Sequence, residues 1–152
     1  VPKESLESHP INGLKPGTTP VQRLVQMRRI ARSFSFGMQV DQSVKENELR
    51  LLPQPIARVT DGSESVNDSA VFAFVSSSGT DPEVFVLIES QKVGAEFVWT
   101  YAVARFTTRE LSQTSADGTT KRIAAADYSK WSGAKIETLY YYRDNTFIQV
   151  GD

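Results

Sequence analysis

The fold of this chain is decided by Ser69–Thr107, which reads SAVFAFVSSSGTDPEVFVLIESQKVGAEFVWTYAVARFT. This stretch holds three runs of apolar and β-branched residues separated by two turn segments, SSGTDP and QKVGA, which is the pattern of a three-stranded antiparallel meander. Odd and even positions are both apolar in most of it, whereas a sheet with one wet face alternates apolar and polar residues. We therefore expect both faces of this sheet to be covered.

The two turns also predict a register. We centre the first turn between Gly79 and Thr80 and the second near Val93. The cross-strand pairs that follow are Phe74–Phe85, Phe72–Leu87, Leu87–Trp99, Phe85–Tyr101 and Asp81–Arg105. They gather the large side chains on one face: Phe72, Phe74, Phe85, Leu87, Phe97, Trp99 and Tyr101. The other face holds smaller residues: Val71, Ala73, Val75, Val84, Val86, Ile88, Val98 and Ala102. A slip of one residue in either hairpin would mix the two sets.

A helix is expected before this block, from Pro20 to about Phe36. Thr18 or Thr19 can cap its first turn, where a proline is tolerated. Its apolar arc is formed by Leu24, Met27, Ile30, Ala31 and Phe34. The helix carries four arginines and no acidic residue, and Arg28, Arg29 and Arg32 are candidates for docking an anionic partner. A solvated polar face is the plainer interpretation of the same residues.

Further strands are expected on both sides of the central block, at 48–52, 56–60, 69–76, 83–90, 96–107, 109–115, 119–124, 136–142 and 146–150. Pro53 and Pro55 interrupt the first two and indicate an edge strand or a kink. The loop over residues 61–68 contains Asp61, Glu64 and Asp68, whose spacing does not follow a calcium loop, so we expect it to be solvated. The sequence predicts an α+β fold in which a curved, mainly antiparallel meander packs against one N-terminal amphipathic helix. A half-open β-barrel plugged by the helix is the alternative.

Composition bounds the possible functions. The chain has 152 residues, of which 39% are hydrophobic and 23% charged, and its formal net charge is −1. This balance suits one soluble globular domain and gives no global electrostatic case for nucleic acid. No segment approaches the roughly 18 apolar residues of a membrane span. We expect residues 1–19 to be a flexible lead-in and residues 20–152 to form a single domain, the C-terminal part of a longer natural chain.

Candidate chemistry is sparse. Cysteine is absent and His9 is the only histidine, so we expect no transition-metal site and no cofactor. Glu89 and Asp81 are the only carboxylates that we consider for general acid–base work, and solvated or paired roles are the plainer interpretation of both. Asp81 is expected to pair with Arg105.

The aromatic face is the best candidate for a small-ligand site. Trp99, Tyr101 and Phe85 could line a pocket for a flat ligand, because aromatic planes with polar edges suit such molecules. The competing interpretation is that this face is the core beneath the helix.

Three stretches resemble a family of uncharacterised bacterial domains: QMRRIARSFS (Gln26–Ser35), ELRLLPQPIARV (Glu48–Val59) and the run from Phe72 to Thr107. The ELRLLPQP and GTDPE elements are the most specific. The resemblance implies an exported location and supplies no catalytic residue, substrate or cofactor.

Three functional hypotheses follow. The first is a non-catalytic binding or protein-interaction domain, with a protein partner or a second copy held through an apolar sheet face. The second is a small-ligand binder that uses the aromatic face. The third is a hydrolase-type enzyme that works through Glu89 or Asp81.

Overall fold

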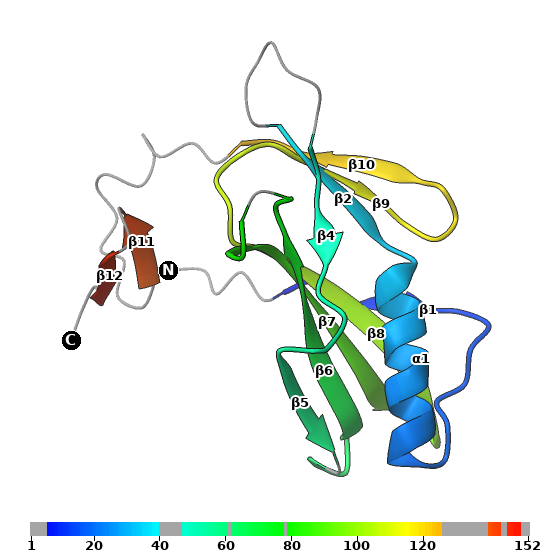
Figure 1. Cartoon of the computed structure of the whole chain (residues 1–152). Helices are drawn as coiled ribbons and strands as arrows, with labels where there is room; N and C mark the ends of the chain where they lie inside the picture. The colour runs from blue at the N-terminus through cyan, green and yellow to red at the C-terminus, as the bar shows by residue number, and fades with distance from the viewer. Residues whose placement is uncertain are drawn as a thin grey trace.

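The computed structural model describes residues 6–39, 47–60, 62–77, 79–125, 140–143 and 146–149. Within these ranges it has one helix and twelve strands (Figure 1). Their bounds are β1 (His9–Ile11), α1 (Pro20–Arg32), β2 (Ser35–Met38), β3 (Asn47–Glu48), β4 (Arg50–Leu51), β5 (Ala57–Thr60), β6 (Val66–Val75), β7 (Pro82–Val93), β8 (Glu96–Arg105), β9 (Leu111–Thr114), β10 (Thr120–Ile123), β11 (Tyr140–Arg143) and β12 (Thr146–Gln149).

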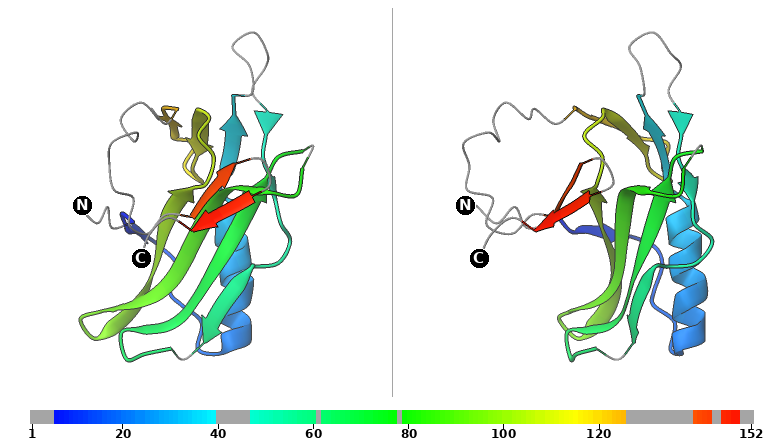
Figure 2. Two further views of the ribbon diagram at one scale, coloured as in Figure 1. Left: turned by 90° about the vertical axis from the view of Figure 1, so that its left-hand side faces the viewer. Right: turned by 60° about the vertical axis from the view of Figure 1, so that its left-hand side comes forward.

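The strands form two larger sheets and a separate hairpin. The main sheet has the order β1–β8–β7–β6–β4, and β5 pairs with the same edge of β6 as β4 does. It is strongly curled, and α1 lies along one of its faces (Figure 2). The second sheet has the order β10–β9–β2–β3, and β11 pairs with β12. Every recorded strand pairing is antiparallel. The predicted α+β class with a curved antiparallel sheet is confirmed.

The core lies between α1 and the main sheet. Met27, Ile30 and Ala31 on the helix pack with Phe34 against the sheet. The sheet contributes Ala70, Phe72, Phe74, Val84, Val86, Ile88 and Trp99. Burying each large side chain contributes about 1.5–3 kcal/mol to stability, so this interface is what holds the helix in place.

The helix ends earlier than predicted. It begins as expected, with Thr19 as N-cap in a capping box with Gln22 and with Pro20 in the first turn. It stops at Arg32, and strand β2 (Ser35–Met38) begins within the last residues of the predicted helix. The reason is a change of period: Phe34, Phe36 and Met38 are buried at alternate positions, which suits a strand and not a helix.

The expected registers are wrong in both hairpins. The second turn sits at Gly94–Ala95, between the pair Val93–Glu96, because Gly94 adopts the positive φ of 64° that such a two-residue turn favours. In the first hairpin Phe74 lies opposite Val84 and not Phe85, with an irregularity at the next pair.

These shifts change which residues share a face. Val84, Val86 and Ile88 face the helix together with Phe72, Phe74 and Trp99. Phe85 and Leu87 point to the opposite face, beside Ala73, Ala102 and Ala104. The predicted separation into a bulky face and a β-branched face therefore does not occur, as expected for an odd-numbered slip.

The lead-in is also better ordered than predicted. Strand β1 pairs with β8, with His9 opposite Tyr101 and Ile11 opposite Trp99. Gln26 on the helix donates to the carbonyl of Lys15 at 2.8 Å and accepts from the backbone N–H of Gly17 at 2.7 Å. Residues 6–19 thus belong to the folded body, because their backbone groups have partners on the sheet and the helix.

Candidate functional site

The clearest surface feature is the line along which α1 meets the edge of the main sheet, where two cavities open. We call it the seam; residues 20–35 line its helix side and residues 48–58 its strand side. Two arginines cross it. Arg58 donates through Nη2 to the carbonyl of Pro20 at 2.5 Å, and Arg28 donates through Nη2 to Oε1 of Gln54. The helix and the edge segment therefore run alongside each other in opposite chain directions.

The end of the seam near the start of α1 is closed by a buried ionic cluster; we call this the lower end. Asp68 on β6 is fully buried and accepts from Arg23 Nε at 2.8 Å. It also accepts from Arg58, through Nη2 at 2.8 Å and Nε at 3.1 Å. Arg23 further donates to the carbonyls of Gly17 and Thr18. The cluster ties the start of the helix, the edge strand β5 and strand β6 together.

The prediction for Asp68 was wrong. We expected it in a solvated loop over residues 61–68, but β6 begins at Val66 and carries Asp68 inside the sheet. Its partner Arg23 lies 45 positions earlier in the chain. Nothing in the local sequence around either residue signals such a long-range pair, although an unpaired buried charge would be prohibitive.

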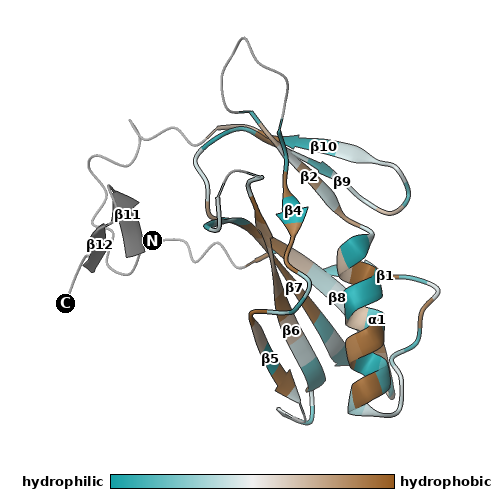
Figure 3. Ribbon diagram, viewed as in Figure 1, coloured by the Kyte–Doolittle hydropathy of each residue, from teal (hydrophilic) through white to brown (hydrophobic). Residues whose placement is uncertain are grey.

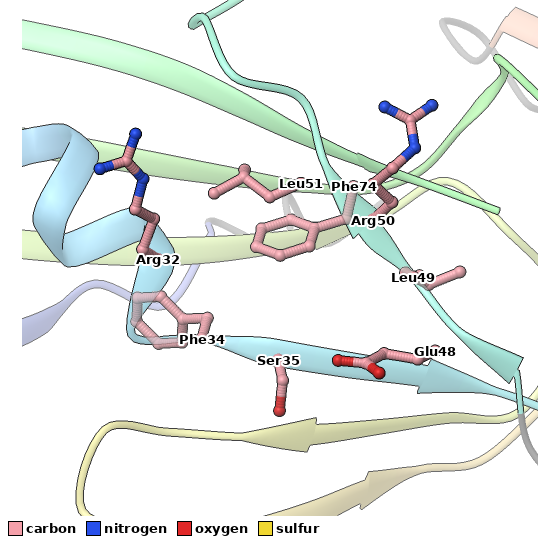
Figure 4. Close-up of a pocket in the computed structure, with 8 residues that line it drawn as sticks. All are labelled: Arg32, Phe34, Ser35, Glu48, Leu49, Arg50, Leu51 and Phe74. Atoms are coloured by element: carbon pink, nitrogen blue, oxygen red, sulfur yellow. The ribbon is translucent and has the colours of Figure 1, made fainter. Parts of the chain in front are cut away.

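Beyond the Arg28–Gln54 bridge, toward the C-terminal end of α1, the helix side and the strand side of the seam separate and leave two adjoining cavities. The smaller, of about 220 Å³, is lined by Arg28, Arg32, Leu51, Leu52, Pro53 and Phe72. The larger, of about 380 Å³, is lined by Arg32, Phe34, Ser35, Glu48, Leu49, Arg50, Leu51 and Phe74 (Figure 4). Arg32 and Leu51 line both, so the two cavities lie side by side.

The larger cavity exists because one segment of chain changes sheets. Leu49 still donates its N–H to the carbonyl of Phe36 on β2, at 2.7 Å. From the next residue the chain pairs with β6 instead, with Arg50 opposite Val75 and Leu51 opposite Phe74. Strands β2 and β4 therefore diverge after Leu49, and the cavity fills the fork between them.

The cavities have an apolar floor and a mostly cationic rim. Phe72 and Phe74 form the base. In Figure 4 the guanidinium groups of Arg32 and Arg50 point outward on either side of Leu51 and Phe74. Within the described residues neither guanidinium has a hydrogen bond or an ion pair. The carboxylate of Glu48 is the one acidic group in the lining.

Arg28 has an unusual arrangement in this setting. Its Nη2 is used by Gln54, but its Nε–H is buried and has no hydrogen-bond partner. A buried donor without an acceptor costs about 1–3 kcal/mol. The charge of the Arg28 guanidinium still borders the smaller cavity, where it favours an anionic group.

Apolar residues continue along the outside of the seam below the cavities. Val21 and Val25 on the helix are 73% and 60% exposed, and Ile56 on the opposite wall is 51% exposed. Figure 3 shows hydrophobic segments on both α1 and β5. The exposed side of the seam is therefore more apolar than a solvated helix face requires.

Comparison with protein-family models, with curated proteins and with solved structures finds no match. The residues of the seam must therefore carry the functional argument by themselves, and the resemblance of the sequence to a bacterial family stays a prediction.

The predicted ligand residues do not form one open face. Trp99 is wholly buried under α1, and Tyr101 is half-buried, with its ring 4.8 Å from that of Phe34 and 5.2 Å from that of His9. Phe85 lies on the other side of the sheet, in an edge-to-face pair with Phe106. The core interpretation of Trp99 matches its burial, and its indole N–H has no partner in the described structure.

The predicted partner-binding arginines separate into two groups. Arg28 and Arg32 both line the seam cavities. Arg29 is exposed and lines neither of them. Arg28 and Arg32 are about one helical turn apart, whereas Arg29 is rotated by about 100° from Arg28 around the helix axis.

The predicted pair of Asp81 and Arg105 is not formed. Arg105 lies opposite Val84, and its guanidinium donates to the carbonyl of Ala124. Glu89 lies within β7 on the face away from the helix, where it accepts from Gln91 at 2.7 Å. Neither carboxylate lines the seam.

The described residues hold neither a metal-binding cluster nor a membrane-spanning helix. No group of three or more His, Cys, Asp or Glu side chains is placed to hold a metal ion there. The helix in that part of the chain is too short and too polar to cross a bilayer.

Proposed function

We propose that this chain is a non-catalytic binding domain that holds an anionic, partly apolar segment of a partner protein in the seam. The observation that carries the proposal is the adjoining pair of cavities with an aromatic floor and three arginines in the lining. Two of those arginines, Arg32 and Arg50, have no partner among the described residues. Apolar pockets with a few convergent polar groups are typical of binding sites.

The charge distribution favours an anion at the helix side. Arg28 and Arg32 converge there, and both belong to the last two turns of α1. Glu48 lies on the β3 side of the larger cavity and would repel a carboxylate placed beside it. The acidic group of the ligand is therefore expected near Arg28 and Arg32, and its apolar part on Phe74, Phe34 and Leu49.

The proposal can be tested with an apolar anion, 8-anilinonaphthalene-1-sulfonate, whose fluorescence rises on entering an apolar site. We expect the native protein to bind it, and Arg32→Glu to weaken that binding about tenfold, as the loss of a charge-assisted contact predicts. Arg29→Glu is the matched control, because it makes the same charge change three residues earlier on α1, at a position that lines neither cavity. Near-ultraviolet circular dichroism would establish that both variants keep the native packing.

Equal dye binding by Arg32→Glu and Arg29→Glu would contradict the proposal, since only the first changes the seam. Absence of binding by the folded wild-type protein would contradict it as well.

A further inference from the structure

The backbone at the fork points to a more specific ligand than the side chains alone. In antiparallel pairing, successive residues of a strand direct their N–H and C=O groups to opposite edges. Leu52 donates its N–H to the carbonyl of Ala73 on β6, at 2.9 Å. The preceding residue, Leu51, therefore directs its N–H and C=O away from β6.

The position of Leu51 makes that direction significant. Leu51 lines both cavities, and β4 lies at the edge of the main sheet. Its free backbone groups thus face the fork, on the side from which the chain has separated from β2. A strand edge of this kind is a template for pairing with another extended chain.

The neighbouring sequence keeps this opening short. Pro53 and Pro55 follow β4 and remove two backbone donors from the edge. Arg58 and Arg28 bridge the seam below. Within the described part of the seam, the segment around Leu51 is therefore the one that combines an open edge with an adjoining apolar cavity.

We propose that the seam binds an extended peptide segment of a partner protein by strand addition to β4 at Leu51. One acidic side chain of the peptide pairs with the guanidinium groups of Arg28 and Arg32, which line the smaller cavity together. A bulky apolar side chain fills the larger cavity against Phe34 and Phe74. Main-chain hydrogen bonds supply affinity and the two pockets supply selectivity, as in other cases of strand addition. This inference rests on the proposed function of the seam.

A peptide explains the site better than an amphiphilic carboxylate does. Both would satisfy the arginines and the aromatic floor, but only a peptide offers a donor and an acceptor at the spacing of a strand to the N–H and C=O of Leu51. The requirement for main-chain pairing is therefore the property to test.

The probe is a random library of linear twelve-residue peptides displayed on phage and selected against the full chain. We expect the enriched sequences to alternate bulky apolar and acidic residues. Binding of synthetic peptides with those sequences would then be measured for Leu51→Ala and Leu51→Pro. Both lose the leucine side chain, but only the second loses the N–H, which an edge strand tolerates. We expect Leu51→Pro to bind at least tenfold more weakly than Leu51→Ala.

A second measurement does not depend on the proline variant folding. The amide of Leu51 in the wild-type chain should exchange with solvent more slowly when the peptide is bound. A peptide N-methylated in its central residues should neither bind tightly nor protect that amide. Decanoate is the control for a simple amphiphilic carboxylate.

The outcomes separate the two proposals. Equal peptide binding by the proline and alanine variants, without protection of the Leu51 amide, would overturn strand addition. If the dye still binds the seam in that case, the proposed binding function stands. Failure of the library to enrich any sequence, or binding of decanoate as tight as that of the peptides, would also overturn the peptide inference.

Discussion

At the scale of single residues, the buried carboxylate of Asp68 is the group on which the seam depends. It holds Arg23 of the helix and Arg58 of the edge strand at the same time. Removing one member of a buried ionic cluster leaves the others uncompensated, which typically costs about 3–5 kcal/mol. The orientation of the two walls at the lower end of the seam is a consequence of this one side chain.

We therefore expect Asp68→Ala to lower the free energy of unfolding by about 3–5 kcal/mol, measured by urea denaturation. Asp81→Ala is the matched control: its side chain is exposed, and a substitution at such a site changes stability by about 0.5 kcal/mol or less. If the two variants unfolded at the same urea concentration, the cluster would not hold the seam together.

Other polar groups in the core contribute less to stability. Ser90 and Trp99 lie opposite each other on β7 and β8, both fully buried, and neither Ser90 Oγ nor Trp99 Nε1 has a partner in the described structure. Asp68 lies on the next strand, opposite Ser90. Asp68, Ser90 and Trp99 thus lie side by side across three strands. Asp68 has two arginine partners, whereas the Ser90 hydroxyl and the Trp99 indole N–H add no stabilising hydrogen bond.

At the scale of elements, the sequence predicted most of the strands, but not β1 and β2, and predicted the pairing poorly. The start of α1 follows from its capping residues, and the edge position of β4 and β5 follows from Pro53 and Pro55, as the structure confirms. The strands expected at 109–115 and 119–124 form the hairpin β9–β10, which turns at Asp117–Gly118. There Thr119 donates to Asp117 at 2.8 Å, and this backbone hydrogen bond lowers the pKa of the carboxyl group.

The register error in the second hairpin has a clear cause. The register of a hairpin depends on which residue of a turn takes the positive φ. The segment QKVGA allowed a centre near Val93 as well as one at Gly94–Ala95 when only composition was considered. Because side chains alternate along a strand, that small displacement moved Phe85 to the face opposite Trp99. The seam was missed for a related reason: its two walls are distant in sequence and meet only through the sheet order.

The observed assignment of residues to the two sheet faces predicts that a charged substitution costs more stability on one strand than on its neighbour. Val86 faces the helix and is fully buried, whereas Val98 is half-buried on the other face. We expect Val86→Asp to cost more than about 4 kcal/mol, because it buries an unpaired charge, and Val98→Asp to cost about 1 kcal/mol. Thermal unfolding would measure both. A larger loss for Val98→Asp would mean that the observed register is wrong.

At the scale of the whole molecule, the chain is built as two sheets with the helix on one face of the larger. Figure 1 shows α1 leading directly into β2 of the second sheet, while β4 returns to the first. The fork beside Leu49 is thus a product of topology, since one chain segment must leave β2 to reach β6. The α+β class could be predicted from local pattern, but this crossover could not, because it depends on pairings between distant strands.

The face of the main sheet that turns away from α1 remains a separate question. It carries half-buried Val71, Phe85, Leu87 and Val98 and the half-exposed Phe106. Association of a protein partner or a second copy through this face stays a prediction. An interface there would lie on the opposite face of the sheet from the core beneath α1 and away from the seam. Locating the contact residues therefore distinguishes the two modes of binding.

The most direct measurement is a nuclear magnetic resonance titration of the ¹⁵N-labelled chain with a peptide enriched from the library. The account predicts that the largest amide shifts fall on both walls of the seam, at residues 28–35 and 48–52, with Leu51 among them. Shifts centred instead on Phe85, Ala102 and Ala104, across the opposite face of the sheet, would contradict it.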